Sequence, residues 1–104
     1  MNKEGGFWKL FPWEKIDFQA SRCRFKGEKR LLRIMRFKPG AKVEMHAHKW
    51  PHDVIVLSGK LIVNYQGKVK TYKAGQVYRI ARSVKHGGEV GKEGCIQMEI
   101  FKKI

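Results

Sequence analysis

The chain has 104 residues, of which 42% are hydrophobic and 31% are charged. This length gives one domain with one core, and the composition is that of an ordinary globular protein. No apolar run approaches the roughly 18 residues of a membrane span, and charged residues interrupt the apolar N-terminal stretch, so we expect a cytoplasmic protein without a membrane partner.

The net charge is +14, from 23 lysines and arginines against nine aspartates and glutamates. Such a charge raises nucleic acid and anionic small molecules as partners. The basic residues never run more than two in a row, however, and no zinc-finger spacing, basic helix or aromatic-interleaved RNA motif accompanies them. We interpret the charge as a solvated basic surface that steers a small anionic substrate, and we do not expect a nucleic-acid partner.

The N-terminal stretch GFWKLFPWEKIDF holds two of the three tryptophans and three of the six phenylalanines. Its helical periodicity over residues 7–18 is weak. We interpret residues 1–24 as an arm or strand that covers the open side of the core or forms a dimer interface, because exposed aromatic patches mark interaction sites. Residues 25–104 form the second predicted unit, a β-barrel.

Short apolar and β-branched segments separated by turn residues follow along the rest of the chain, which predicts an all-β sandwich or barrel. Gln66-Gly67 indicates a hairpin, and residues 87–94, with four of the eleven glycines, predict a loop. The predicted strands are 31–37, 42–46, 53–57, 60–65, 68–73, 76–81 and 95–101.

The segment 95–101 alternates in polarity and places Ile96, Met98 and Ile100 on one face, which we expect to form the wall of the barrel. The two cysteines, Cys23 and Cys95, do not make a disulfide framework. We expect buried thiols in a reducing compartment, with a single bridge as the alternative.

All four histidines fit one metal site, since His46, His48 and His52 lie within seven residues and His86 follows. On a strand, residues i and i+2 point to the same side about 6.6 Å apart, so the imidazoles of His46 and His48 can converge on one ion. Pro51 disfavours a helix and starts a second strand near His52. We therefore predict one divalent ion held by these four histidines, among iron, manganese, copper, nickel and zinc.

Three further residues are candidates for the pocket. Glu44 shares strand parity with His46 and could orient a ligand or transfer a proton, a solvated rim carboxylate being the alternative. Trp50 and Met98 could contact the substrate, and plain packing is the alternative for both. No catalytic nucleophile arrangement remains once all four histidines are assigned to the metal.

These residues resemble the cupin family. Its first motif reads G-x5-H-x-H-x3,4-E-x6-G, and the chain matches this spacing from Gly40 to Gly59. His52 stands where the motif has its glutamate ligand. The segment HAHKWPHDVIVL is similar to that of small single-domain cupins that bind metal through four histidines.

The second cupin motif reads G-x5-P-x-G-x2-H-x3-N, and the chain matches its spacing from Gly75 through His86. Ala81, Ser83 and Val90 replace its proline, glycine and asparagine. The resemblance implies a single-domain jelly-roll β-barrel with the ion near its centre, and commonly a homodimer.

Four neutral ligands would leave the charge of a divalent ion uncompensated, so that the ion attracts an anionic oxygen. We therefore expect a metal-dependent oxidoreductase of dioxygenase type that acts on an anionic or enolisable small molecule. Two alternatives remain, because the same fold hosts different functions. One is a non-catalytic cupin that binds or senses a small ligand, and the other is a cupin-type sugar isomerase or epimerase.

Overall fold

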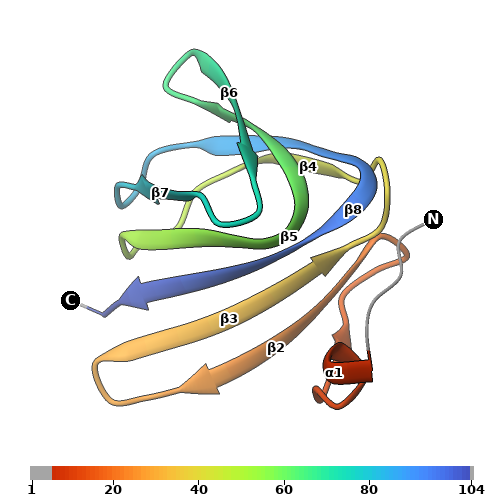
Figure 1. Ribbon diagram of the computed structural model, residues 1–104. Coiled ribbons are helices and arrows are strands. Elements are labelled where there is room, and N and C mark those ends of the chain that lie inside the picture. The colour runs from red at the N-terminus through yellow and green to blue at the C-terminus, as the bar shows by residue number, and fades with distance from the viewer. Residues whose placement is uncertain (1–5, 104) are drawn as a thin grey trace.

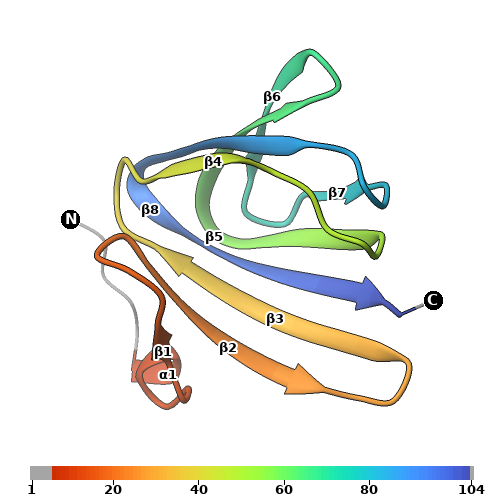
Figure 2. The same cartoon turned by 180° about the vertical axis from the view of Figure 1, so that it is seen from behind.

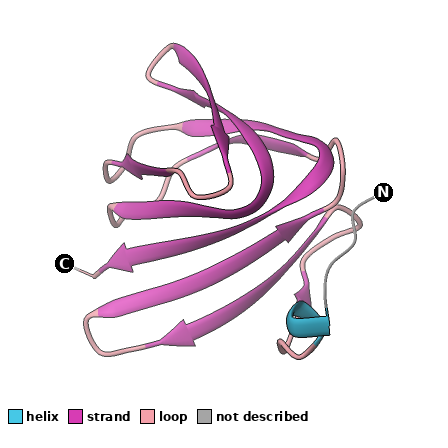
Figure 3. Ribbon diagram, in the orientation of Figure 1, coloured by secondary structure: helices cyan, strands magenta, loops and turns pink. Residues whose placement is uncertain are grey.

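The computed structural model describes residues 6–103 and shows an antiparallel β-fold with one short helix (Figure 1, Figure 3). The all-β prediction is therefore confirmed. The elements in chain order are α1 (Gly6–Lys9), β1 (Glu14–Lys15), β2 (Ala20–Lys26), β3 (Arg30–Phe37), β4 (Lys42–His46), β5 (His52–Tyr65), β6 (Lys68–Lys73), β7 (Val77–Ile80) and β8 (His86–Lys102).

The strands form one sheet of order β1-β2-β3-β8-β5-β6, with β4 paired to β8 and β7 paired to β5. The sheet curls over on itself without closing into a continuous barrel, as Figures 1 and 2 show from opposite sides.

In the described residues no helix is long and apolar enough to cross a membrane.

The two longest strands, β5 and β8, pair with each other along most of their lengths. His52 at the start of β5 lies opposite Phe101, and Tyr65 at its end lies opposite His86. Register shifts near Gly59 bend this ladder, because irregular pairing lets strands turn sharply. The curl brings the two ends of the ladder together, so that the ring centroids of His52 and His86 are only 5.4 Å apart.

The structure corrects two expectations about the elements. The predicted strands 53–57 and 60–65 form one continuous strand, and the predicted loop 87–94 is part of β8. The glycines of that segment allow close backbone approach instead of a turn, since a Cβ at Gly88 would overlap the carbonyl oxygen of Ile62. In the N-terminal stretch the helix ends at Lys9, and Pro12 follows.

Two apolar clusters lie on opposite faces of the sheet. The inner one lies between the curled walls and is formed by Ala20, Met35, Phe37, Ala41, Val56, Leu61, Val63, Val90 and Cys95. The outer one is formed by Cys23, Ile34 and Ile96, against which Trp8, Phe11, Trp13, Leu32, Leu57 and Met98 pack. Aromatic side chains of the arm thus cover part of the outer face. The boundary after residue 24 and the use of the arm as a dimer interface stay predictions.

Cys23 and Cys95 are both buried and unpaired, as expected for thiols without a disulfide. Burial raises the pKa of both, that of Cys95 to about 12. Since the thiolate is the reactive form, neither side chain is an activated nucleophile.

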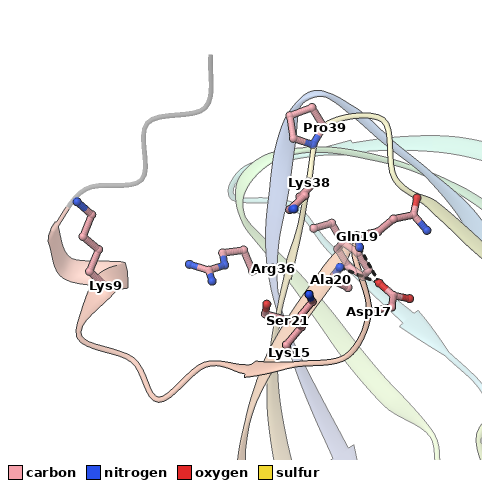
Figure 4. Close-up of a pocket in the computed structure, with 10 residues that line it drawn as sticks. Lys9, Lys15, Asp17, Gln19, Ala20, Ser21, Arg36, Lys38 and Pro39 are labelled. Atoms are coloured by element: carbon pink, nitrogen blue, oxygen red, sulfur yellow. Dashed lines mark hydrogen bonds between the residues drawn. The ribbon is translucent and has the colours of Figure 1, made fainter.

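A groove of about 840 Å³ separates the arm from β2 and β3 (Figure 4). Lys9, Lys15, Arg36 and Lys38 line it together with Asp17, whose Oδ1 accepts hydrogen bonds from backbone N–H groups at the start of β2. The groove concentrates positive charge on this side of the molecule. Its described lining offers no histidine or cysteine to a metal ion.

Replacing Gly59 with alanine should destabilise the fold by about 3 kcal/mol, from backbone strain and from overpacking. Gly59 has φ +80°, and a Cβ there would overlap the carbonyl oxygen of Gly94 where β5 and β8 bend. Chemical unfolding measured by circular dichroism would give the change.

The matched control for this variant is Gly67→Ala. Gly67 has a similar φ of +75° but open space around the position of a Cβ. It should cost only the left-handed backbone strain of about 1–2 kcal/mol. Equal losses in the two variants would contradict a role for close packing at Gly59.

Candidate metal centre

Three of the four histidines lie at neighbouring ends of three strands. His46 ends β4, His52 starts β5 and His86 starts β8, while His48 lies in the connection between β4 and β5. That connection is held in place by a 2.7 Å hydrogen bond from the backbone N–H of Ser83 to the carbonyl of His48. The bend that contains Pro51 therefore returns the chain as expected.

Three of these histidines form a compact group of donors. One ring nitrogen from each of His46, His48 and His86 lies within 4.8 Å of the other two. The ring centroids are 4.8 Å apart for His46 and His48, 4.3 Å for His46 and His86, and 5.4 Å for His48 and His86. The predicted convergence of His46 and His48 from one chain segment is present, and His86 joins them from β8.

His52 lies beside this group, although its nitrogen is not within the same 4.8 Å set. Its ring centroid is 5.1 Å from that of His48, and its ring stacks on Phe101 at 4.5 Å. Its Nδ1 is buried without a hydrogen-bond partner in the described part of the chain. Ligation by His52 therefore stays a prediction.

Backbone carbonyls hold two of the rings in position. Nδ1 of His46 lies 2.8 Å from the carbonyl oxygen of Glu44, and Nδ1 of His86 lies 3.1 Å from that of Val84. A carbonyl can only accept, so each Nδ1 carries the proton and each Nε2 keeps a free lone pair. Oriented imidazoles of this kind are typical of metal-ligating histidines.

His48 presents a different signal. Its Nε2 is buried and has no hydrogen-bond partner among residues 6–103. An unsatisfied buried polar atom is costly, and the cost is relieved when a ligand completes the site. A nitrogen of this kind beside two oriented imidazoles fits a metal ion.

His48, His52 and His86 favour the neutral form that binds metals. Burial, helped by the charge of Arg33, lowers the pKa of His48 to about 3. Burial also lowers the pKa of His52 to about 4, outweighing the opposite effect of Glu99, and it lowers the pKa of His86. Protons therefore do not compete with a metal for these three rings at neutral pH.

The rings open into a cavity of about 240 Å³ between the curled walls of the sheet. Met35, Phe37, Val43, Leu61 and Val63 provide most of its apolar wall.

The polar wall of the cavity includes an ion pair between Arg33 on β3 and Glu99 on β8, with side chains 17% and 7% exposed. Gln97 lies beside them and donates through Nε2 to Glu99 over 3.1 Å. Tyr78 completes this side, and burial raises its pKa so that the phenol keeps its proton.

Sequence reasoning missed Arg33, Gln97 and Glu99. The available signal was the alternation of segment 95–101, which sets Gln97 and Glu99 on the face opposite Ile96 and Met98. The polar pair faces the cavity, whereas Met98 packs partly buried against the outer cluster. The expected wall of Ile96 and Met98 therefore lies on the outer face, away from the cavity.

The two remaining candidates contribute differently from what we expected. Glu44 is exposed, and its backbone carbonyl rather than its carboxylate orients His46. Trp50 does not belong to the cavity lining. Its ring is half-buried between the ammonium groups of Lys49 and Lys103, at 4.9 and 5.9 Å from its centroid.

Comparison with known families adds to this geometry. The sequence profile of the family described as Cupin domain matches residues 33–96, more than half of the chain. This chain belongs to the cupin family. Ser83, at the glycine position of the second cupin motif, has φ +63°, a left-handed conformation that glycine adopts more readily. No significant match to a curated protein was found.

Solved structures confirm the cupin jelly-roll fold for this chain. An RmlC-like cupin from Shewanella frigidimarina has 23% identity and a TM-score of 0.83, covering 99% of this chain and 90% of the other. KdgF from Halomonas sp. has 15% identity and a TM-score of 0.82, covering 92% and 89%. A variant of Bacillus subtilis oxalate decarboxylase has 17% identity and a TM-score of 0.81, covering 91% of this chain and 28% of the enzyme. At these identities the likeness concerns the fold alone.

Proposed function

We propose that this cupin binds one divalent transition-metal ion through His46, His48, His86 and His52. The observation that carries the proposal is the buried, unpartnered Nε2 of His48 beside the two rings whose Nδ1 atoms backbone carbonyls hold. Nitrogens that share an ion at about 2.1 Å lie no farther apart than about 4.2 Å. The 4.8 Å grouping is thus close to a binding geometry, and a small approach of the rings would complete it.

The identity of the ion is open among iron, manganese, copper, nickel and zinc. Imidazole ligands suit all of these except that manganese prefers harder oxygen donors. Manganese nevertheless stays among the candidates, because Bacillus subtilis oxalate decarboxylase, which shares this fold, has Mn(II) centres.

For the reaction, we propose a metal-dependent oxidoreductase of dioxygenase type that acts on a small anionic or enolisable molecule. A bound ion would supply Lewis-acid and redox chemistry. The chain itself supplies Arg33 as a fixed positive charge in the cavity and a protonated Tyr78 as a hydrogen-bond donor. The apolar wall, with Leu61 and Val63, would exclude water from the bound molecule.

A non-catalytic cupin that binds a small ligand is the second candidate, and one observation favours it. Glu99 is the carboxylate in the described cavity lining, and both of its oxygens already accept hydrogen bonds from Arg33 and Gln97. Arg33 and Gln97 thus each occupy one lone pair of this carboxylate and orient it toward themselves, which disfavours a role as general base. The predicted homodimer is also a proposal, and the exposed Phe7, Leu10 and Phe18 of the arm support it.

Elemental analysis of protein purified without an affinity tag tests metal binding. We expect one transition-metal ion per chain. Iron, manganese, copper or nickel would direct substrate screens to oxygen consumption, and zinc would favour Lewis-acid chemistry. Protein that contains no metal and takes up none on titration would refute the proposal.

A further inference from the structure

Gln97 lines the cavity that also contains the histidines, and it has an unused hydrogen-bond acceptor. The side chain is 5% exposed, and its Oε1 is buried without a hydrogen-bond partner among the described residues. A buried amide oxygen without a donor costs free energy, so a polar group from outside the chain is expected to satisfy it.

The orientation of this amide follows from its neighbour. Arg33 is permanently charged and forms an ion pair with the carboxylate of Glu99. A carboxylate only accepts hydrogen bonds, so the amide must turn its Nε2 toward Glu99, as the 3.1 Å contact shows. The Oε1 atom is thereby committed as the acceptor, and its partner must be a hydroxyl, an N–H group or water.

The charges around the cavity indicate what else this ligand carries. Arg33 pairs with Glu99, Arg22 pairs with Glu14, and the four imidazoles are uncharged ligands, so a bound divalent ion would leave the cavity positive. Arg33 bonds to Glu99 through Nε, which leaves N–H donors on its two terminal nitrogens. Both features favour an anionic oxygen.

The polar wall and the histidines also adjoin each other. The Arg33 guanidinium lies 5.3 Å from the centroid of the Phe101 ring, and the rings of His48 and His52 also lie beside Phe101. One small molecule within about 240 Å³, below the usual range of drug-sized pockets, would meet both groups.

We propose that Gln97 determines the specificity of this site, and that the ligand is a small hydroxycarboxylate. Its hydroxyl donates to Oε1 of Gln97, and its carboxylate lies toward Arg33 and the metal ion. This inference rests on the proposed metal-binding function and narrows its substrate class.

Calorimetric titration of the metal-loaded protein with lactate, 3-hydroxypropionate and propionate tests the proposal. The two hydroxy acids place the hydroxyl on different carbons, and propionate lacks it. At least one of them should bind about fivefold more tightly than propionate, the effect of one ordinary hydrogen bond. Absence of any hydroxyl preference in the wild-type protein would overturn the proposal without recourse to a variant.

The variant Gln97→Met tests whether the hydroxyl preference comes from Gln97 or from direct coordination of the ion by the hydroxyl. The preference, measured as the ratio of the affinities for the preferred hydroxy acid and for propionate within the same variant, should fall to near unity. Val69→Met, which adds the same side chain on the exposed face of β6, should retain the preference. A preference that survives in Gln97→Met would assign the hydroxyl to the metal and overturn the role of Gln97.

The metal content of every sample distinguishes this inference from the proposed function. Absence of the hydroxyl preference in the metal-loaded wild-type protein counts against the inference on Gln97 and leaves the proposed metal site standing. If the wild-type protein holds no metal, the proposed function fails, and the same three acids are titrated into the metal-free protein, where Arg33 still attracts the carboxylate. Equal affinities there would overturn the inference as well.

Discussion

Replacing His48 with alanine should lower the affinity for the metal ion by more than about 100-fold, because loss of a direct ligand exceeds the 10–100-fold effect of losing a group that orients one. His48 is the histidine whose Nε2 is buried without a partner, so its lone pair has no other use in the described structure. Competition with a chromophoric chelator, at equal protein folding by circular dichroism, would give the affinity.

Two companion variants sharpen this experiment. Met45→Ala changes a half-exposed neutral side chain on β4, three residues before His48, and should leave the affinity unchanged. His52→Ala decides the number of ligands, since His52 lies beside the three-histidine group rather than within it. A strong loss supports four ligands, and full metal occupancy would reduce the site to three. An unchanged affinity in His48→Ala would refute the site altogether.

Replacing Arg33 with methionine should destabilise the protein by about 3 kcal/mol or more, because it leaves a buried carboxylate without its partner. The side chain of Glu99 is only 7% exposed, and Gln97 alone would remain to compensate its charge. Urea unfolding of the metal-free protein measures the loss without a contribution from a bound ion.

The double variant Arg33→Met with Glu99→Gln is the control for this prediction. The amide oxygen at position 99 still accepts from Gln97, but no charge is left buried, so most of the stability should return. A loss below about 1 kcal/mol in Arg33→Met would be typical of a solvated surface ion pair and would contradict the burial argument.

The cluster of histidines was largely predictable from the sequence because its signals are local. The His46–His48 spacing predicted that both rings lie on one strand, and Pro51 predicted the bend that follows. The strand expectation was wrong for His48, because β4 ends at His46 and His48 lies in the connection, yet the two rings still lie close together. The cupin motif spacing then connected His86 to them across the chain, and the structure brings its ring to theirs. Whether His52 completes the set depends on side-chain packing, which spacing does not determine.

The polar wall of the cavity could not be predicted from the sequence, for a physical reason. Alternation in segment 95–101 shows that β8 has an apolar and a polar face, and the apolar face is normally assigned to the interior. Here the arm, with Trp8 and Trp13, covers the outer face, so Met98 is sheltered there. The pairing of Arg33 with Glu99 spans 66 residues of sequence and follows only from the register of β3 against β8.

The prediction of a loop at the glycine-rich residues 87–94 was wrong for a related reason. Glycine marks both turns and places where two backbones approach, and composition does not separate these cases. A Cβ at Gly87 would lie 2.7 Å from the carbonyl oxygen of Val43, which shows that β4 and β8 require its absence. The hairpin at Gln66-Gly67, by contrast, was predictable because both residues have the positive φ that such turns demand.

The central position of β8 has a consequence for how the protein is made. This strand pairs with β3, β4 and β5 and carries His86, Gln97 and Glu99. A growing chain on the ribosome has none of these pairings until residues 86–102 have emerged from the exit tunnel. The strands translated earlier therefore keep unpaired edges. Neither the fold nor the cluster of imidazoles forms until β8 has been translated.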